Sequence, residues 1–135
     1  MIDYNRFTLD TGLTVLVHED AATPMAVVNV LYDVGARDEN PSKTGFAHLF
    51  EHLMFGGSIH IPDYDEPLQR AGGDNNAYTT NDLTNYYCQL PAQNIETAFW
   101  LESDRMLSLA FSEKSLAVQR KVVCEEFREH YINKR

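Results

Sequence analysis

The sequence predicts an α+β fold with a largely antiparallel sheet and helices packed on it. Three observations support this: a β-hairpin opens the chain, strand and helix patterns fall in separate blocks, and no internal repeat appears. Because a doubly wound parallel sheet needs strands and helices that alternate regularly, the separate blocks favour the antiparallel arrangement. With 135 residues, 44% of them hydrophobic, the chain is expected to form one domain at most, with a moderate core.

Hydrophobic periodicity and turn residues give the expected order of the elements. They are a hairpin over residues 6–9 and 13–18, a strand over 25–34, a helix over about 45–55, a short helix over 64–71, a strand over 83–90, and helices over 95–109 and from 112 to about 131. Gly12 supplies the hairpin turn. The strand over 25–34 is rich in valine, and apolar residues at helical spacing mark the last two helices.

Capping and turn residues mark where the helices begin and end. Ser42 or Thr44 can cap the first helix, Gly56-Gly57 is a natural stop for it, and Ser112 is a plausible N-cap of the last helix. Residues 74–82 are polar and typical of turns.

Composition excludes several classes of function. The formal net charge of -9 argues against non-specific nucleic-acid binding. No apolar run approaches the length of a membrane span, and the first residues do not begin a signal peptide. We therefore expect a soluble protein, of the cytoplasm or, if a leader has been removed, of the periplasm. Cys88 and Cys124 are expected to be buried free thiols, not a disulfide.

The segment from His48 to His52 carries the clearest chemistry. In a helix, His48 and His52 lie one turn apart on the same face, so both can reach one metal ion. Glu51 projects beside the pair without having to bind the metal. Two neutral nitrogen ligands and a nearby base suit a zinc hydrolase, and the order is the inverted counterpart of the commoner His-Glu-x-x-His motif. The alternative is two ordinary helix histidines, one packed and one solvated.

A third ligand is sought on the last helix. Its apolar side is expected to be formed by Leu116, Val122, Val123 and Phe127. Glu126 flanks that side, where a carboxylate is costly unless it is paired or bound to a cation. On pattern, Glu126 is therefore the third metal ligand or, equally well, an ion-pair partner of Arg120 or Arg128.

Several ordered motifs extend this pattern along the chain. They are the residues of 35–39 (GARDE), 45–58 (GFAHLFEHLMFGGS), 71–79 (AGGDNNAYT), 84–87 (TNYY) and 120–126 (RKVVCEE). Together they resemble the pitrilysin family, the inverzincins that include insulysin and the mitochondrial processing peptidase. The resemblance covers essentially the whole chain, from the first hairpin to the last helix, and it implies the N-terminal part of a catalytic domain.

The resemblance implies a zinc endopeptidase and assigns roles by position. His48, His52 and Glu126 match the family's zinc ligands, and Glu51 matches its general base. Many active members carry a second glutamate just before the arginine of the last motif. Here that position is Gln119, an amide that can form hydrogen bonds but supplies no charge.

The resemblance also implies a substrate-binding strand. An edge strand that pairs with the bound peptide follows the Gly-Gly turn in the family, and residues 76–79 match it, with Asn76 and Ala77 closest to the scissile bond. From the residues alone, Asn75-Asn76 could equally form a plain turn, because asparagine tolerates left-handed backbone.

Family members pair this kind of domain with a second, similar one. Residues 1–135 are therefore expected to be a partial domain that binds zinc and cleaves peptides poorly alone. Two alternatives remain: a non-catalytic pairing subunit, or a zinc-stabilised domain in which His130 adds a fourth ligand. His18 and His60 lie outside any motif and are expected to be surface or strand histidines.

Overall fold

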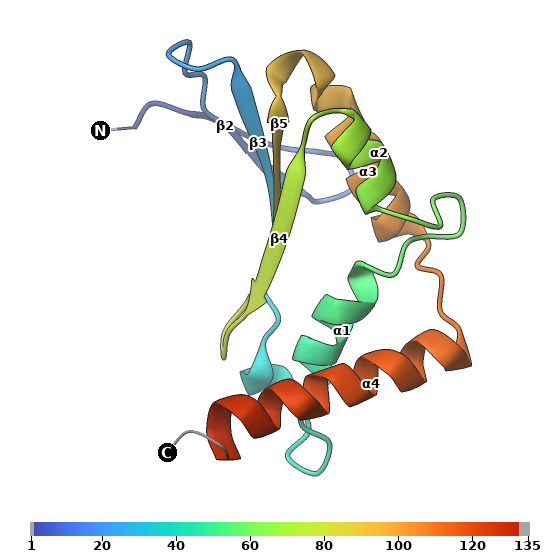
Figure 1. Cartoon of the computed structure of the whole chain (residues 1–135). Coiled ribbons are helices and arrows are strands. Elements are labelled where there is room, and N and C mark those ends of the chain that lie inside the picture. Colours follow the sequence, from blue (N-terminus) through green and yellow to red (C-terminus); the bar gives the residue numbers. More distant parts are fainter. Residues whose placement is uncertain (1, 133–135) are drawn as a thin grey trace.

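A computed structural model of the protein describes residues 2–132 and confirms an α+β fold (Figure 1). The strands are β1 Asn5–Thr8, β2 Thr14–Val17, β3 Met25–Tyr32, β4 Asp74–Thr79 and β5 Thr84–Pro91. The helices are α1 Phe46–Met54, α2 Asp65–Arg70, α3 Ile95–Leu107 and α4 Glu113–Phe127, with short helical turns at η1 Ala36–Asp38, η2 Ala92–Asn94 and η3 Arg128–Ile132. No helix in this described part of the chain is both long and apolar enough to cross a membrane.

All strand pairs are antiparallel, as expected. β5 lies between β3 and β4 in a three-stranded sheet, while β1 and β2 form a separate hairpin. The interpretation of residues 74–79 as turn-rich was wrong: they form β4, an edge strand that pairs with β5 from Asp74↔Gln89 to Thr79↔Thr84. Pairing with an established neighbour outweighs the low strand propensity of aspartate and asparagine.

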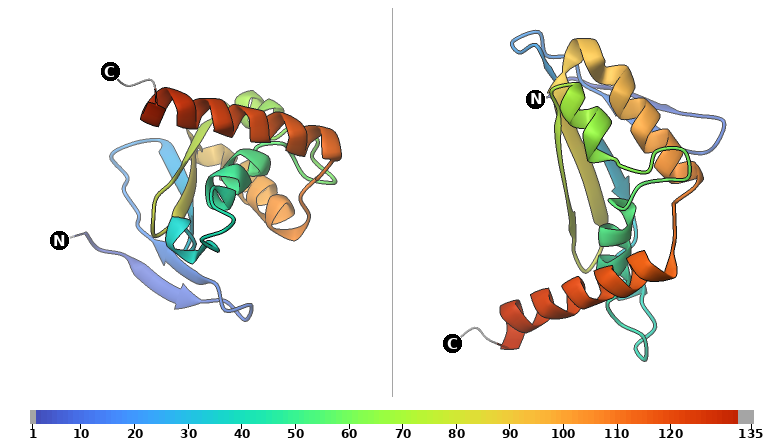
Figure 2. Two further views of the ribbon diagram at one scale, coloured as in Figure 1. Left: turned by 90° about the horizontal axis from the view of Figure 1, so that it is seen from below. Right: turned by 45° about the vertical axis from the view of Figure 1, so that its right-hand side comes forward.

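Helices α1, α2 and α3 contact one face of the three-stranded sheet (Figure 2). The core between them is formed by Ile61, Tyr64, Leu68, Cys88, Leu90, Ala98 and Leu101. Cys88 is buried there, and burial raises the pKa of its thiol to about 11. Cys124 lies exposed on α4, so the expectation of two buried thiols was wrong for this residue.

A buried ion pair between α3 residues anchors this helix under the sheet. Arg105 donates to Glu102 through Nε and Nη2, at 3.0 and 2.7 Å, and the Tyr64 hydroxyl donates to the same carboxylate at 2.7 Å. The Arg105 guanidinium lies 4.5 Å from the ring centres of both Tyr64 and Tyr86. These contacts offset the high cost of burying both charges.

Removing one partner of this pair is expected to destabilise the fold strongly. Glu102→Ala leaves Arg105 as a buried, uncompensated charge, so the free energy of unfolding should fall by about 3–5 kcal/mol. Urea denaturation followed by circular dichroism measures the loss. Glu66→Ala, which breaks the exposed Glu66–Arg70 pair, is the matched control and should cost less than about 1 kcal/mol. Equal losses in the two variants would contradict the role given to burial.

Candidate metal centre

Helix α1 owes its start to Glu39. The two oxygens of this carboxylate accept hydrogen bonds from the backbone N–H groups of Gly45, at 2.8 Å, and Ala47, at 2.7 Å. The prediction of Ser42 or Thr44 as the cap was wrong, because one carboxylate satisfies two of the unpaired N–H groups and also carries the charge that the helix dipole favours. Glu39 thereby fixes the end of the helix from which His48 projects.

The structure brings the predicted ligand residues together where α4 crosses α1 (Figure 1). The Nε2 atoms of His48 and His52 lie 3.1 Å apart. Glu126 Oε2 lies 3.3 Å from His48 Nε2 and 3.4 Å from His52 Nε2. Glu126 therefore faces the histidine pair, while Arg128 pairs with Glu125 instead.

These separations suit a single zinc ion. Two ligand atoms about 2.0–2.1 Å from one ion at a tetrahedral angle lie about 3.3 Å apart. The three donor atoms match that spacing, and two imidazoles with one carboxylate form a common catalytic donor set. The side chains of His48, His52 and Glu126 are 40%, 20% and 39% exposed, so solvent can reach the cluster. That these residues bind zinc stays a prediction.

The face of α4 that turns toward α1 is largely polar. Ser115, Gln119, Val123 and Glu126 are half-buried along it. The expected apolar side was only partly right, because Leu116, Val122 and Phe127 are 45%, 39% and 56% exposed. Ser112 is the N-cap as expected, since its Oγ accepts from the Ser115 N–H at 3.0 Å.

His130 does not join the cluster. The group of possible metal donors found among residues 2–132 consists of His48, His52 and Glu126, and His130 lies exposed in η3. His18 and His60 are also exposed. His18 Nδ1 lies 2.6 Å from the Asp3 carbonyl oxygen, and His60 Nδ1 lies 2.8 Å from Asp104 Oδ1. Among the described residues the cluster therefore offers three protein donors, the number typical of a catalytic zinc site, whereas structural sites usually have four.

Glu51 projects from α1 toward the edge strand. Its Oε2 accepts a hydrogen bond of 2.5 Å from the hydroxyl of Thr79, the last residue of β4. Tyr86 of β5 lies close by, and burial raises the pKa of its hydroxyl, an effect that Arg105 opposes and Glu51 reinforces. Thr79 was not singled out from the sequence, because its contact partner lies 28 residues away.

Asn76 and Ala77 both lie on β4, so a plain turn at Asn75-Asn76 is wrong. Asn75, Ala77 and Thr79 are half-buried, while Asn76 is exposed on the other face of the strand. The Asn76 side chain bends back, and its Oδ1 accepts from the Ala77 N–H at 2.8 Å. A peptide pairing with this edge would compete with Asn76 for that N–H. Their contact with substrate stays a prediction.

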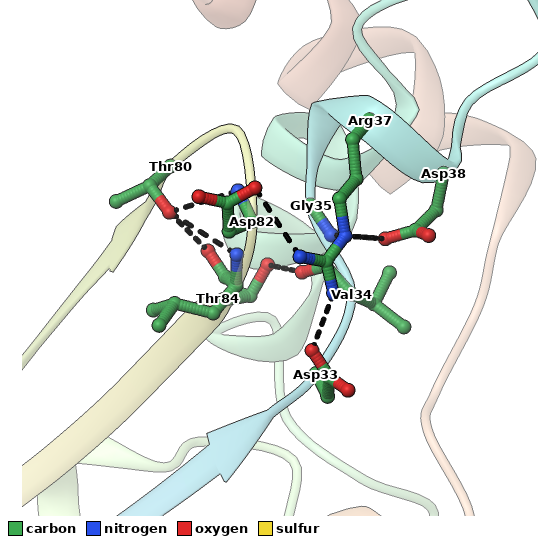
Figure 3. A network of polar contacts seen from close by, with 9 residues as sticks. Asp33, Val34, Gly35, Arg37, Asp38, Thr80, Asp82 and Thr84 are labelled. Atoms are coloured by element: carbon green, nitrogen blue, oxygen red, sulfur yellow. Dashed lines mark hydrogen bonds and ion pairs between the residues drawn. The ribbon is translucent and has the colours of Figure 1, made fainter.

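A second network holds the turn after β4 (Figure 3). The Arg37 guanidinium contacts the carboxylates of Asp33, Asp38 and Asp82. The backbone N–H groups of Ala36 and Arg37 donate to the carbonyls of Thr80, at 3.2 Å, and Asn81, at 2.8 Å. Residues 35–39 thus clamp the turn between β4 and β5 and also supply the cap of α1. We refer to them as the bracket segment.

A hollow of about 580 Å³ lies behind α1, lined by apolar side chains that include Phe46, Phe50 and Met54. None of His48, Glu51, His52 or Glu126 lines it. The three candidate metal donors and Glu51 therefore lie outside this hollow.

Comparison with known proteins places this chain in a family. A family model described as insulinase (peptidase family M16) matches residues 14–134. The chain is 36% identical over 124 residues to the zinc protease PqqE of Helicobacter pylori, covering 90% of this chain and 28% of that protein. It is 31% identical over 124 residues to the probable mitochondrial-processing peptidase subunit beta of Arabidopsis thaliana, covering 90% of this chain and 23% of that one.

Solved structures of two proteases also match the fold of this chain. The crystal structure of a protease from Helicobacter pylori matches with a TM-score of 0.89 and 34% identity, covering 96% of this chain and 32% of that chain. Pitrilysin matches in fold with a TM-score of 0.84 and 24% identity, covering 95% of this chain and 14% of that chain. The chain thus spans about a third or less of the length of these relatives.

Proposed function

Because the chain belongs to the insulinase (M16) family of peptidases, we propose that it forms the metal-binding part of a zinc endopeptidase. The convergence of His48 Nε2, His52 Nε2 and Glu126 Oε2 within 4.8 Å carries this proposal. Two imidazole nitrogens aimed at each other and at a carboxylate oxygen suit a bound divalent cation, and the donor set favours zinc.

In this proposal, His48, His52 and Glu126 hold the ion and Glu51 is the general base. When bound, Zn²⁺ polarises the scissile carbonyl and acidifies a water molecule. Glu51 takes the proton from the attacking water and passes it to the leaving amine. Its position one residue before His52 places it beside the cluster and leaves the donor set complete without it.

The substrate is proposed to lie extended along the outer edge of β4. An edge strand offers unpaired backbone groups, so a peptide can add to the sheet by main-chain hydrogen bonds. Binding there displaces Asn76 Oδ1 from the Ala77 N–H and frees both groups for the peptide. Asn76 and Ala77 are accordingly the proposed substrate contacts.

We further propose that residues 1–135 act as a partial domain with a second homologous domain or subunit. The chain covers 28% of the length of PqqE, and apolar side chains such as Val27 and Leu31 on β3 and Leu107 at the end of α3 are exposed. Exposed apolar side chains of this kind are typical of surfaces that contact another unit. A non-catalytic pairing subunit is the alternative, and the intact Glu51 and donor set weigh against it.

Metal-dependent hydrolysis of a quenched fluorescent peptide tests the proposed function. We expect one zinc per chain, slow hydrolysis by this chain and faster hydrolysis by a longer polypeptide that includes the second domain. Treatment with 1,10-phenanthroline should stop hydrolysis, and added zinc should restore it. Hydrolysis that is unaffected by the chelator, or a longer polypeptide that binds zinc without hydrolysing any peptide, would contradict the proposal.

A further inference from the structure

We infer that Thr79 is a positioning residue for Glu51: its hydroxyl fixes the carboxylate beside the metal cluster and joins α1 to the edge strand. The inference rests on the proposed function, because it concerns the group assigned there as the base. The Thr79 hydroxyl donates a hydrogen bond to Oε2 of the Glu51 carboxylate. A hydrogen bond to an ionised carboxylate is roughly twice as strong as one between neutral groups.

The position of Thr79 is set without any help from α1. Thr79 pairs with Thr84 at the end of the β4–β5 ladder, and the Thr84 hydroxyl donates to the Val34 carbonyl at 2.9 Å. The next residue, Thr80, closes the turn with Leu83 through its N–H, at 2.8 Å, and accepts from the bracket segment. These contacts fix the backbone on which Thr79 sits, so its hydroxyl can orient a partner instead of following it.

The α1 side of the contact is held as well. Glu39 of the bracket segment caps α1, so the same short segment fixes both the helix that carries Glu51 and the turn beside Thr79. These contacts fix the backbone of α1 but not the Glu51 side chain, and glutamate is among the side chains with the most rotamer entropy to lose. The Thr79 hydroxyl removes that freedom before a substrate binds, which is how a site is preorganised.

The bond also leaves the base able to act. Thr79 engages Oε2 of Glu51, so Oε1 is the oxygen available to a water molecule or a ligand. Thr79 lies on the half-buried face of β4, whereas its neighbour Tyr78 is exposed on the other face. The Thr79 side chain thus lies on the face of β4 from which it donates its hydrogen bond to the base.

Binding of acetohydroxamic acid to the zinc-loaded chain tests the inference without requiring turnover. A hydroxamate chelates the metal through two oxygens and gives its hydroxyl proton to a correctly placed carboxylate. Thr79→Val, nearly equal in shape but without the hydroxyl, should weaken acetohydroxamate binding about 10-fold in calorimetry, as expected for loss of a hydrogen bond to a charged group. Thr79→Ser should restore most of the affinity, and zinc affinity should stay within about threefold in both.

Two further variants separate the possible outcomes. Glu51→Gln sets the loss expected when the base is absent, and Thr14→Val, at an exposed position of β2, is the matched control. If Glu51→Gln weakens acetohydroxamate binding and Thr79→Val does not, the inference is overturned and the proposed function stands. A parallel fall of zinc affinity in Thr79→Val overturns it too, because the residue would then support the fold. If Glu51→Gln binds as tightly as the wild type, the base assigned in the proposed function is wrong.

Discussion

His52→Ala is expected to lower zinc affinity by more than about 100-fold, beyond the effect usual for residues that only support a ligand. His52 is the least exposed of the three donors and lies 3.1 Å from His48 Nε2 and 3.4 Å from Glu126 Oε2. Its loss leaves one imidazole and one carboxylate, which hold zinc poorly against water. Competition with a chromophoric chelator measures the affinity, and elemental analysis after dialysis gives the stoichiometry.

The matched control is His18→Ala, because His18 is exposed and its Nδ1 contacts only a backbone carbonyl oxygen among the described hydrogen bonds. This variant should keep one zinc per chain and the wild-type affinity. Retention of stoichiometric, tight zinc by His52→Ala would sink the assignment of the cluster. Loss of zinc by His18→Ala as well would point to unfolding, which circular dichroism of the same samples detects.

The elements that could be predicted from sequence are those with strong local signals. The hairpin, β3, α1, β5 and the Ser112 cap of α4 were predicted because periodicity, turn glycines and capping side chains act over a few residues. β4 was not predicted from composition, because Asp74, Asn75 and Asn76 are poor strand formers that depend on β5 for pairing. Only the resemblance to a known family implied an edge strand there.

Burial was harder to predict than secondary structure. In α3, the apolar positions Phe99 and Met106 are 56% and 44% exposed, while the charged Glu102 and Arg105 are 4% and 3% exposed. A hydrophobic pattern assigns charged residues to the surface, so it misses a buried ion pair that hydrogen-bonds a residue outside its own helix, here Tyr64. For the same reason, the hydrophobic pattern did not predict that α4 turns a largely polar face toward α1.

In the candidate site too, some residues could be predicted from local pattern, while the contacts that hold them could not. His48 and His52 follow from helical geometry, since residues four apart share a face. The pattern alone could not decide whether Glu126 is a metal ligand or an ion-pair partner of an arginine. The resemblance to a known family favoured the metal ligand. The contacts that hold the site, from Glu39 to the helix end and from Thr79 to Glu51, join residues 8 and 28 positions apart. No periodicity encodes such contacts, because they arise only when separate elements meet.

Glu51→Gln is expected to keep zinc and lose hydrolysis. Glutamine matches glutamate in shape and can still accept the Thr79 hydrogen bond, but it cannot take a proton from water. Loss of a general base typically lowers kcat by about 10²- to 10⁴-fold. Because Glu51 is not one of the three clustered donors, zinc affinity should stay at the wild-type value. Initial rates with a fluorogenic peptide, measured on the longer polypeptide together with its metal content, give both quantities.

Glu125→Gln is the matched control for this variant. Glu125 is an exposed carboxylate on α4, next to a proposed zinc ligand, and it pairs with Arg128. The same change of charge there should leave kcat within about threefold, since exposed ion pairs contribute little. Hydrolysis by Glu51→Gln within a few-fold of the wild type would show that another group accepts the proton. Loss of zinc by Glu51→Gln would instead make Glu51 a ligand, and the donor set of His48, His52 and Glu126 would then be incomplete.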